Sequence, residues 1–100
     1  MSSREEIRIV IVDRGFIFAG PILRSPDGSI TIERGVCVRR WGGDSKGIGY
    51  TAKHGPTGRD AVDGMPCGVE VPAISVIAVL GCDQDVWSQA IKTACAEIEK

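Results

Sequence analysis

The chain has few aromatic residues, one histidine and no long apolar run, and each shortage excludes a class of protein. Only 5% of its 100 residues are aromatic, so aliphatic side chains must form most of a thin core. The single histidine, His54, has no carboxylate or thiol patterned beside it, as general acid–base catalysis would require. The apolar run that begins at Ile7 breaks at residues 13–15, far short of the ~20 residues of a membrane-spanning helix. The sequence therefore predicts a single, non-enzymatic domain, residues 1–100, that does not interact with membranes.

The cysteines lack the spacing of a metal site, and the N-terminus lacks a secretion signal. Cys37, Cys67, Cys82 and Cys95 are far apart and form no C-x-x-C pair, so we expect no metal and no cofactor. Residues 1–6 are polar, without the apolar segment that follows the basic start of a signal peptide, and we expect them to be flexible. The sequence thus predicts a cytoplasmic protein whose thiols are free and mostly buried.

Charge is unevenly distributed along the chain, although the net charge of −1 is too small for a general nucleic-acid coat protein. Residues 1–33 carry −1, residues 34–59 carry +5 and residues 60–100 carry −5. One interpretation is chance segregation on a solvated surface. The other is a cationic middle segment that binds anions or the acidic last third of a neighbouring subunit. Together with a thin core and an apolar terminal helix, the second interpretation predicts a homo-oligomer.

Short β-branched runs separated by glycine and proline turns predict an antiparallel sheet. The runs cover residues 7–12, 16–20, 30–32, 36–41, 69–72 and 74–80. In the last run, apolar residues occupy both faces, which fits a strand that is covered on both sides. One of these faces carries Ile74, Val76, Ala78 and Leu80. We expect a mainly β, α+β fold: a small antiparallel β-roll or open barrel of five or six strands with a long central loop and a C-terminal helix.

The terminal helix is expected over residues 84–100, and either of the aspartates near its start can cap it. Trp87, Ile91, Ala94 and Ile98 recur at helical spacing and form one apolar stripe. We therefore expect Trp87 in the core, with the helix packed on the sheet or on a partner chain.

The central loop is expected over residues 42–68, which contain eight glycines and two prolines. Residues 48–54 have the composition for one or two helical turns before Gly55 and Pro56 end them. A loop of this length is uncommon in a compact domain and usually has a function or is disordered.

The strongest candidate for a binding site follows the strand expected at residues 36–41. This strand ends in two arginines and a tryptophan and opens into a segment with four glycines and a lysine. Such glycines let backbone N–H groups approach a ligand, and guanidinium groups beside an indole suit an anionic, planar molecule. The alternative is that Trp41 covers the edge of the core while the arginines extend into water. The candidate ligand-binding residues are Arg39, Arg40, Trp41, Gly42, Gly43, Lys46, Gly47 and Tyr50.

The known phosphate-binding motifs are not met. Residues 47–52 fit G-x-G-x-x-A, but a flexible segment precedes them and Gly55 ends any helix after one or two turns, so a dinucleotide site is not expected. Lys46 is followed by Gly47, so the P-loop pattern also fails. No paired-carboxylate, Ser-His-Asp or Cys-His pattern indicates a catalytic residue.

Several short motifs together resemble a known group of proteins. They are V-R-R-W-G at residues 38–42, K-G-I-G at 46–49, G-P at 55–56 and V-P at 71–72, followed by Trp87. This order is similar to that of the small, functionally uncharacterised accessory proteins encoded by tailed phages and prophages. The resemblance implies a phage accessory protein in the host cytoplasm that blocks or sequesters a host component. It implies no mechanism.

The leading functional prediction is a non-enzymatic protein that binds a phosphate-bearing small molecule, a nucleotide or nucleotide-derived signal, and sequesters it from host defence. The first alternative is a structural or protein-interaction module, either a virion component or an inhibitor of a host protein, with Trp41 and Tyr50 as anchors. The second alternative is a weak nucleic-acid binder.

Overall fold

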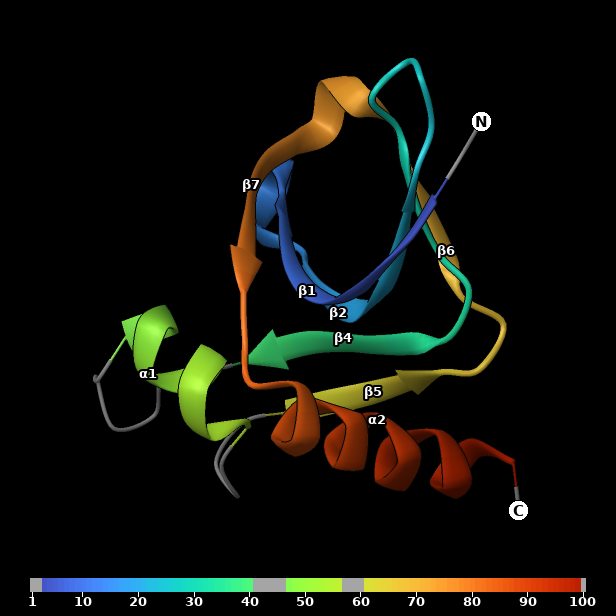
Figure 1. The fold of residues 1–100 in the computed structure, drawn as a ribbon. Coiled ribbons are helices and arrows are strands. Elements are labelled where there is room, and N and C mark those ends of the chain that lie inside the picture. Colours follow the sequence, from blue (N-terminus) through green and yellow to red (C-terminus); the bar gives the residue numbers. More distant parts are fainter. Residues whose placement is uncertain (1–2, 41–46, 57–60, 100) are drawn as a thin grey trace.

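The computed structural model describes residues 3–40, 47–56 and 61–99, which form seven strands, two α-helices and two short 3-10 helices (Figure 1). The strands are β1 (Ser3–Val12), β2 (Ile17–Arg24), β3 (Ile30–Ile32), β4 (Gly35–Arg40), β5 (Ala61–Met65), β6 (Val69–Val71) and β7 (Val76–Gly81). The helices are α1 (Gly47–His54), α2 (Gln84–Ile98), η1 (Asp13–Gly15) and η2 (Ala73–Ser75). The expected mainly β fold with a C-terminal helix is confirmed, and the sheet is open, with seven strands in place of the expected five or six.

All strand pairs are antiparallel, in the order β5-β4-β2-β1-β7, with β3 paired to β2 and to β6. β2 changes partner midway, because its first half pairs with β4 and its second half with β3. The change falls at Gly20, where a Cβ would lie 2.6 Å from Ile32 Cγ2 and 2.8 Å from the Arg34 carbonyl oxygen. Only glycine leaves room for the β3–β4 turn at this point.

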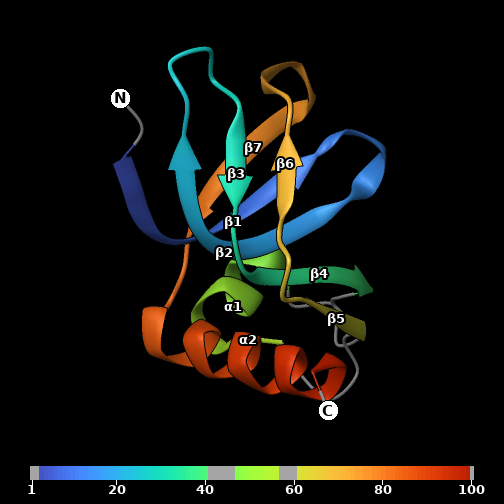
Figure 2. The same cartoon turned by 90° about the vertical axis from the view of Figure 1, so that its right-hand side faces the viewer.

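The sheet buries apolar side chains on both faces, which explains the nearly continuous apolar run in β1. Ile9 packs into a cluster with Trp87 and other residues of the helices, whereas Val10 packs into a second cluster inside the roll of β1, β2, β3, β6 and β7. Figures 1 and 2 show the roll on one side of β4 and β5 and α2 on the other. β1 already begins at Ser3, so it includes most of the polar segment 1–6 for which we expected flexibility.

Helix α2 begins after Asp83, whose carboxylate accepts a hydrogen bond from the Val86 N–H at 3.0 Å. Its buried residues are Trp87, Ile91 and Cys95. The expected stripe was wrong at its end, because Ile98 is 60% exposed and Cys95 takes the core position instead. The cysteine Sγ lies 3.5 Å from the Gly35 carbonyl oxygen, so the helix contacts the sheet at Cys95 and extends past it at Ile98.

Helix α1 confirms the short helix expected within residues 48–54, and it ends where glycine was expected to end it. Gly55 has φ +83° and donates its N–H to the Thr51 carbonyl oxygen at 2.8 Å, a left-handed helix C-cap. The fully buried Trp87 holds this helix: its indole N–H donates to the carbonyl oxygens of Thr51 at 3.2 Å and Ala52 at 3.1 Å. The expected core position of Trp87 is therefore confirmed.

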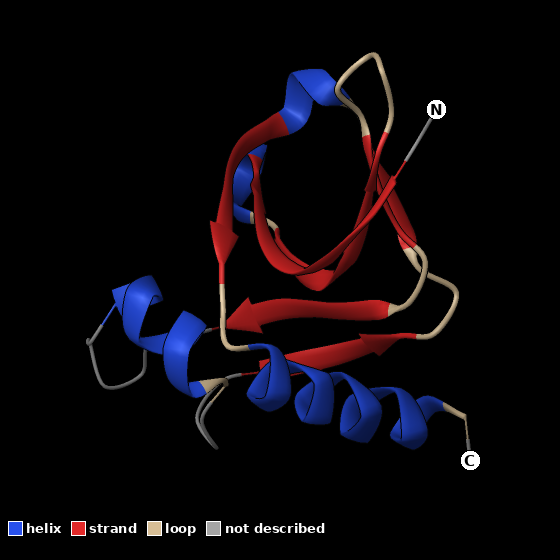
Figure 3. Cartoon of the chain, in the orientation of Figure 1, coloured by secondary structure: helices blue, strands red, loops and turns tan. Residues whose placement is uncertain are grey.

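The expectation of an irregular loop over residues 42–68 was wrong for residues 61–65. These residues form β5, which pairs along β4 and lies against α2 (Figure 3). The segment has a single β-branched residue, Val62, so its strand depends on neighbours that are distant in sequence. Gly64 shows this dependence, because a Cβ there would collide with the carbonyl oxygen of Ala94 on α2.

The last strand also differs from the expectation, because β7 begins at Val76 rather than at Ile74. Ile74 lies in η2, which follows Pro72, and it is 95% exposed. A register shift against β1 makes Ile77 an extra, bulged residue that is 66% exposed. The simple alternation from Ile74 to Leu80 therefore fails, and β7 is not covered on both sides at Ile77.

No helix in the described part of the chain is long and apolar enough to cross a membrane.

We predict opposite effects for the same substitution at two glycines. Gly64→Ala should lower the free energy of unfolding by about 1–3 kcal/mol, because the methyl group meets the backbone of α2. Gly49→Ala should raise it by about 0.5–1 kcal/mol, because Gly49 lies in α1 with no atom within 4 Å of the added Cβ. Urea unfolding measures both, and equal effects would contradict the close approach of α2 to β5.

Trp87→Phe should lower the free energy of unfolding by about 1–3 kcal/mol, because it removes a buried N–H donor that the carbonyl groups of Thr51 and Ala52 share and leaves each with one backbone donor. Amide hydrogen exchange in α1 should accelerate more than exchange in β1. Ile98→Ala on the same helix is the control, with a change of less than about 0.5 kcal/mol because Ile98 is exposed. Uniform acceleration across the sheet would show that Trp87 does not hold α1 specifically.

Candidate functional site

Two arginines line a pocket of about 350 Å³ between the β1–β2 turn and β4. The turn closes through a hydrogen bond from the Val12 N–H to the Phe16 carbonyl oxygen, at 2.9 Å. β4 lies beside it because β2 pairs with β4 immediately after the turn. The pocket is lined by Arg14, Gly15, Phe16, Cys37, Val38 and Arg39. We refer to it as the arginine pocket.

Arg14 has an unusual backbone conformation, with φ 64° and ψ 17°, and Gly15 follows with φ 84°. Two consecutive positive φ angles are typical of a type I′ hairpin turn, where asparagine usually precedes glycine. A residue such as arginine adopts the left-handed region at a cost of roughly 1–2 kcal/mol. Within the described part of the chain, Arg14 has no ion-pair partner. The pocket is therefore lined by a cation with a strained backbone and no ion-pair partner among the described residues.

Arg39 supplies the second guanidinium group, and it forms an ion pair with Asp63 on the neighbouring strand β5. The register between β4 and β5 shifts between Val38 and Arg40, so Arg39 is a bulged residue. Bulges redirect a side chain out of the regular alternation of a strand. Both partners are largely exposed, and Asp63 can therefore exchange with another anion.

An aromatic ring and a neutral thiol complete the arginine pocket. Phe16 is 54% exposed, and its ring lies parallel to that of Phe18 with centroids 6.1 Å apart. Partial burial raises the pKa of the Cys37 thiol above its ordinary value, so the thiol stays protonated at neutral pH. The pocket thus combines two cations with a flat apolar surface.

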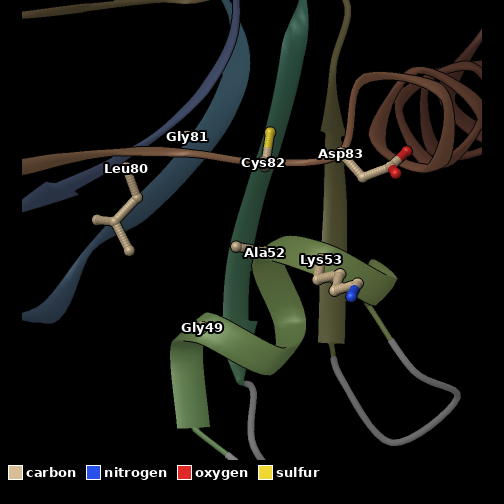
Figure 4. Close-up of a pocket in the computed structure, with 7 residues that line it drawn as sticks. All are labelled: Gly49, Ala52, Lys53, Leu80, Gly81, Cys82 and Asp83. Carbon is tan, nitrogen blue, oxygen red and sulfur yellow. The ribbon is translucent and has the colours of Figure 1, made fainter.

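A larger pocket of about 520 Å³ lies between α1 and the chain that leads from β7 to α2 (Figure 4). It has few groups suited to an anion, because the Asp83 carboxylate caps α2 and Lys53 is the single cation in its lining. The Cys82 Sγ is directed away from α1 and contacts the Ile7 carbonyl oxygen at 3.5 Å. Desolvation raises the pKa of Cys82 to about 11, so this thiol is no nucleophile at neutral pH.

The structure separates the residues that the sequence grouped together. Arg39 lines the arginine pocket, whereas Gly47 and Tyr50 lie on α1, and Tyr50 packs against His54 with ring centroids 4.4 Å apart. Arg40 is the last residue of β4. The other candidates lie outside the described residues: Trp41, Gly42, Gly43 and Lys46.

Sequence reasoning missed Arg14, Phe16 and Cys37. The turn at residues 13–15 was expected. Its arginine occupies the position where a type I′ turn favours asparagine, and this unusual choice is the signal that could have indicated a functional role for Arg14. Cys37 reaches the pocket because it pairs with Phe18 across β2 and β4, a contact that no local pattern predicts.

The uneven distribution of charge along the sequence is partly neutralised within the chain. The Arg34 guanidinium donates to both carboxylate oxygens of Glu99, at 2.7 and 3.1 Å, and holds the pKa of Glu99 below its ordinary value. Arg39 likewise meets the acidic last third at Asp63. Charge attraction between the middle and last thirds is thus at least partly intramolecular, which weakens it as an argument for a second subunit.

A scan against protein-family models and searches of curated proteins and of solved structures found no match to this chain. In residues 3–40, 47–56 and 61–99, no three His, Cys, Asp or Glu side chains gather as a metal site would require. The function must therefore be inferred from the geometry of the chain itself.

We predict that the thiols differ strongly in reactivity. At about pH 8, iodoacetamide should modify the exposed Cys67 first, because a thiolate is needed for attack and burial keeps Cys37 and Cys82 protonated. The rate at Cys82 should rise as the pH approaches 11, its shifted pKa. Mass spectrometry of tryptic peptides measures each site, and unfolding in urea should make the rates similar. Modification of Cys82 as fast as Cys67 in the folded protein would contradict this assignment.

Proposed function

We propose that the protein binds a phosphate-bearing, planar small molecule, a nucleotide or nucleotide-derived signal, at the arginine pocket and does not turn it over. The observation that carries the proposal is Arg14, an uncompensated guanidinium in a strained turn, beside Arg39 and the exposed ring of Phe16. Strained residues cluster at functional sites, where binding offsets their cost.

Each lining group has a role in such a complex. Arg14 donates to two phosphate oxygens at once, as its planar fork allows. Arg39 exchanges the Asp63 carboxylate for a second phosphate oxygen. The exposed ring of Phe16 stacks on the planar part of the ligand. A volume of about 350 Å³ lies within the range of small-molecule sites.

The lining of the arginine pocket supports binding without chemistry. Apart from the two guanidinium groups, its titratable residue is Cys37, whose raised pKa keeps it from acting as a nucleophile or base at neutral pH. Binding without turnover removes a signal from solution. The resemblance to phage accessory proteins supports such a sequestering role in a host cytoplasm. Four further candidate residues, Arg40 to Gly43, follow Arg39 directly in the sequence.

A thermal-shift series with nucleoside monophosphates, diphosphates and cyclic nucleotides tests the proposal. A ligand at ~100 times its Kd should raise the free energy of unfolding by ~2.7 kcal/mol. Arg14→Asn should abolish this shift while raising the stability of the free protein by about 1 kcal/mol, because asparagine suits the left-handed turn. Arg39→Ala should weaken binding tenfold or more, about 1.5–3 kcal/mol for a charged hydrogen bond.

Lys92→Ala removes an exposed cation on α2, far along the chain from the pocket, and should leave the ligand-induced shift unchanged. The proposal fails if no phosphorylated compound shifts the unfolding temperature, or if Arg14→Asn retains the full shift. Binding of single-stranded oligonucleotides but not mononucleotides, with a steep salt dependence, would instead favour the nucleic-acid alternative.

A further inference from the structure

The open sheet has three edge strands in the described part of the chain, and only one of them carries no charge. β5 pairs with β4 alone and carries Asp63, whereas β6 pairs with β3 alone and carries Glu70. β7 pairs with β1 alone, and neither it nor its flanking residues 73–82 contain a charged side chain. Edge strands normally carry charges or proline to prevent pairing with another chain. β7 lacks this protection.

The β7 edge also presents the most exposed large apolar side chains of the described residues. Ile74 is 95% exposed and Ile77 is 66% exposed. The bulge at Ile77 would usually blunt an edge, but here it directs an apolar side chain into solvent. Figure 1 shows β7 at the margin of the roll. An uncharged strand that pairs on one side only, with exposed isoleucines at Ile77 and at Ile74 just before it, is suited to pairing with a further strand.

We propose that this edge is the homodimer interface, in which β7 pairs antiparallel with β7 of a second copy of the chain. A two-fold axis perpendicular to the strand makes the pairing antiparallel, and it places the same surface on both copies. Self-pairing opposes no like charges, because the strand contains none. Each copy then extends the sheet of the other across the axis.

The sequence of β7 favours a two-fold axis at Ala78. The strand reads Val-Ile-Ala-Val-Leu over residues 76–80, with the smallest side chain at the centre. An axis at Ala78 places the exposed Ile77 opposite Val79 of the partner subunit, a β-branched pair typical of stable sheets. A six-residue strand and Ile74 make an interface smaller than the ~800 Å² per partner of a standard complex. We therefore expect a weak dimer that dissociates on dilution.

The dimer interface is independent of the proposed ligand site. No residue of β7 lines the arginine pocket, so dimerisation leaves that pocket open. A substitution can therefore abolish dimerisation without abolishing ligand binding, or the reverse, so the two proposals can fail separately.

Sedimentation velocity over a range of protein concentrations tests the interface. The unmodified chain should shift from monomer towards dimer as concentration rises. Ile77→Lys should abolish the dimer, because each copy would set a lysine opposite Val79 of the partner subunit, with the two like charges diagonal to each other across the axis. Ile98→Lys, the same substitution at a similarly exposed site on α2, should leave it intact. A monomer at every concentration, a dimer that survives Ile77→Lys, or equal loss in both variants would overturn the proposal.

A cysteine crosslink tests the position of the axis without relying on a destabilising substitution. Ala78→Cys, in a chain whose exposed Cys67 is replaced by alanine, should form a covalent dimer under mild oxidation, because the axis sets the two thiols opposite each other. The Cys67→Ala chain alone should remain uncrosslinked. Lys92→Cys in the same background should crosslink far more slowly. Equal rates for Ala78→Cys and Lys92→Cys would overturn the assignment of β7.

Discussion

The contact of Trp87, on α2, with the last turn of α1 holds both helices together against the sheet. The indole is fully buried in the cluster between sheet and helices, and its N–H donates to the carbonyl oxygens of Thr51 and Ala52. The Thr51 carbonyl also accepts the Gly55 N–H, but the residue four positions after Ala52 is Pro56, which has no N–H to donate. The Asp83 N–H adds a hydrogen bond to Ala52 at 2.9 Å. An eight-residue helix is unstable alone, so its position depends on this contact.

Apolar side chains pack on both faces of the sheet, which restricts the surfaces where a ligand or a partner can bind. β1 contributes Ile9 to one cluster and Val10 to the other, and α2 covers the outer face of the β4–β5 pair. The turns and the edge strands are the surfaces that remain for a ligand or a partner. The two most unusual features occur there: the left-handed Arg14 in the β1–β2 turn and the uncharged edge strand β7 with its exposed Ile77. Stability alone would favour asparagine at the position of Arg14 and a charged residue or proline in the edge strand β7.

Local patterns predicted the strands and helices that carry their own apolar signal. β1 contains the expected run 7–12 and begins four residues earlier, α1 ends before the expected glycine, and α2 begins after Asp83 as expected. β5 could not be predicted, because its residues become a strand only between β4 and α2, with Gly64 admitting the helix backbone. Cys95 replaced Ile98 in the core for a similar reason, since the helix extends past the sheet.

For the proposed binding site, the sequence by itself determined that Arg39 lies near the end of a β-branched strand and that a cationic, glycine-rich segment follows this strand. Only the tertiary structure decided which groups surround that arginine. β2 pairs with β4 immediately after the β1–β2 turn, and this pairing sets Arg14 and Phe16 beside Arg39, 23 or more residues away in the chain. Strand register is a long-range property, because it depends on how both faces of the sheet are buried. No local periodicity contains that information.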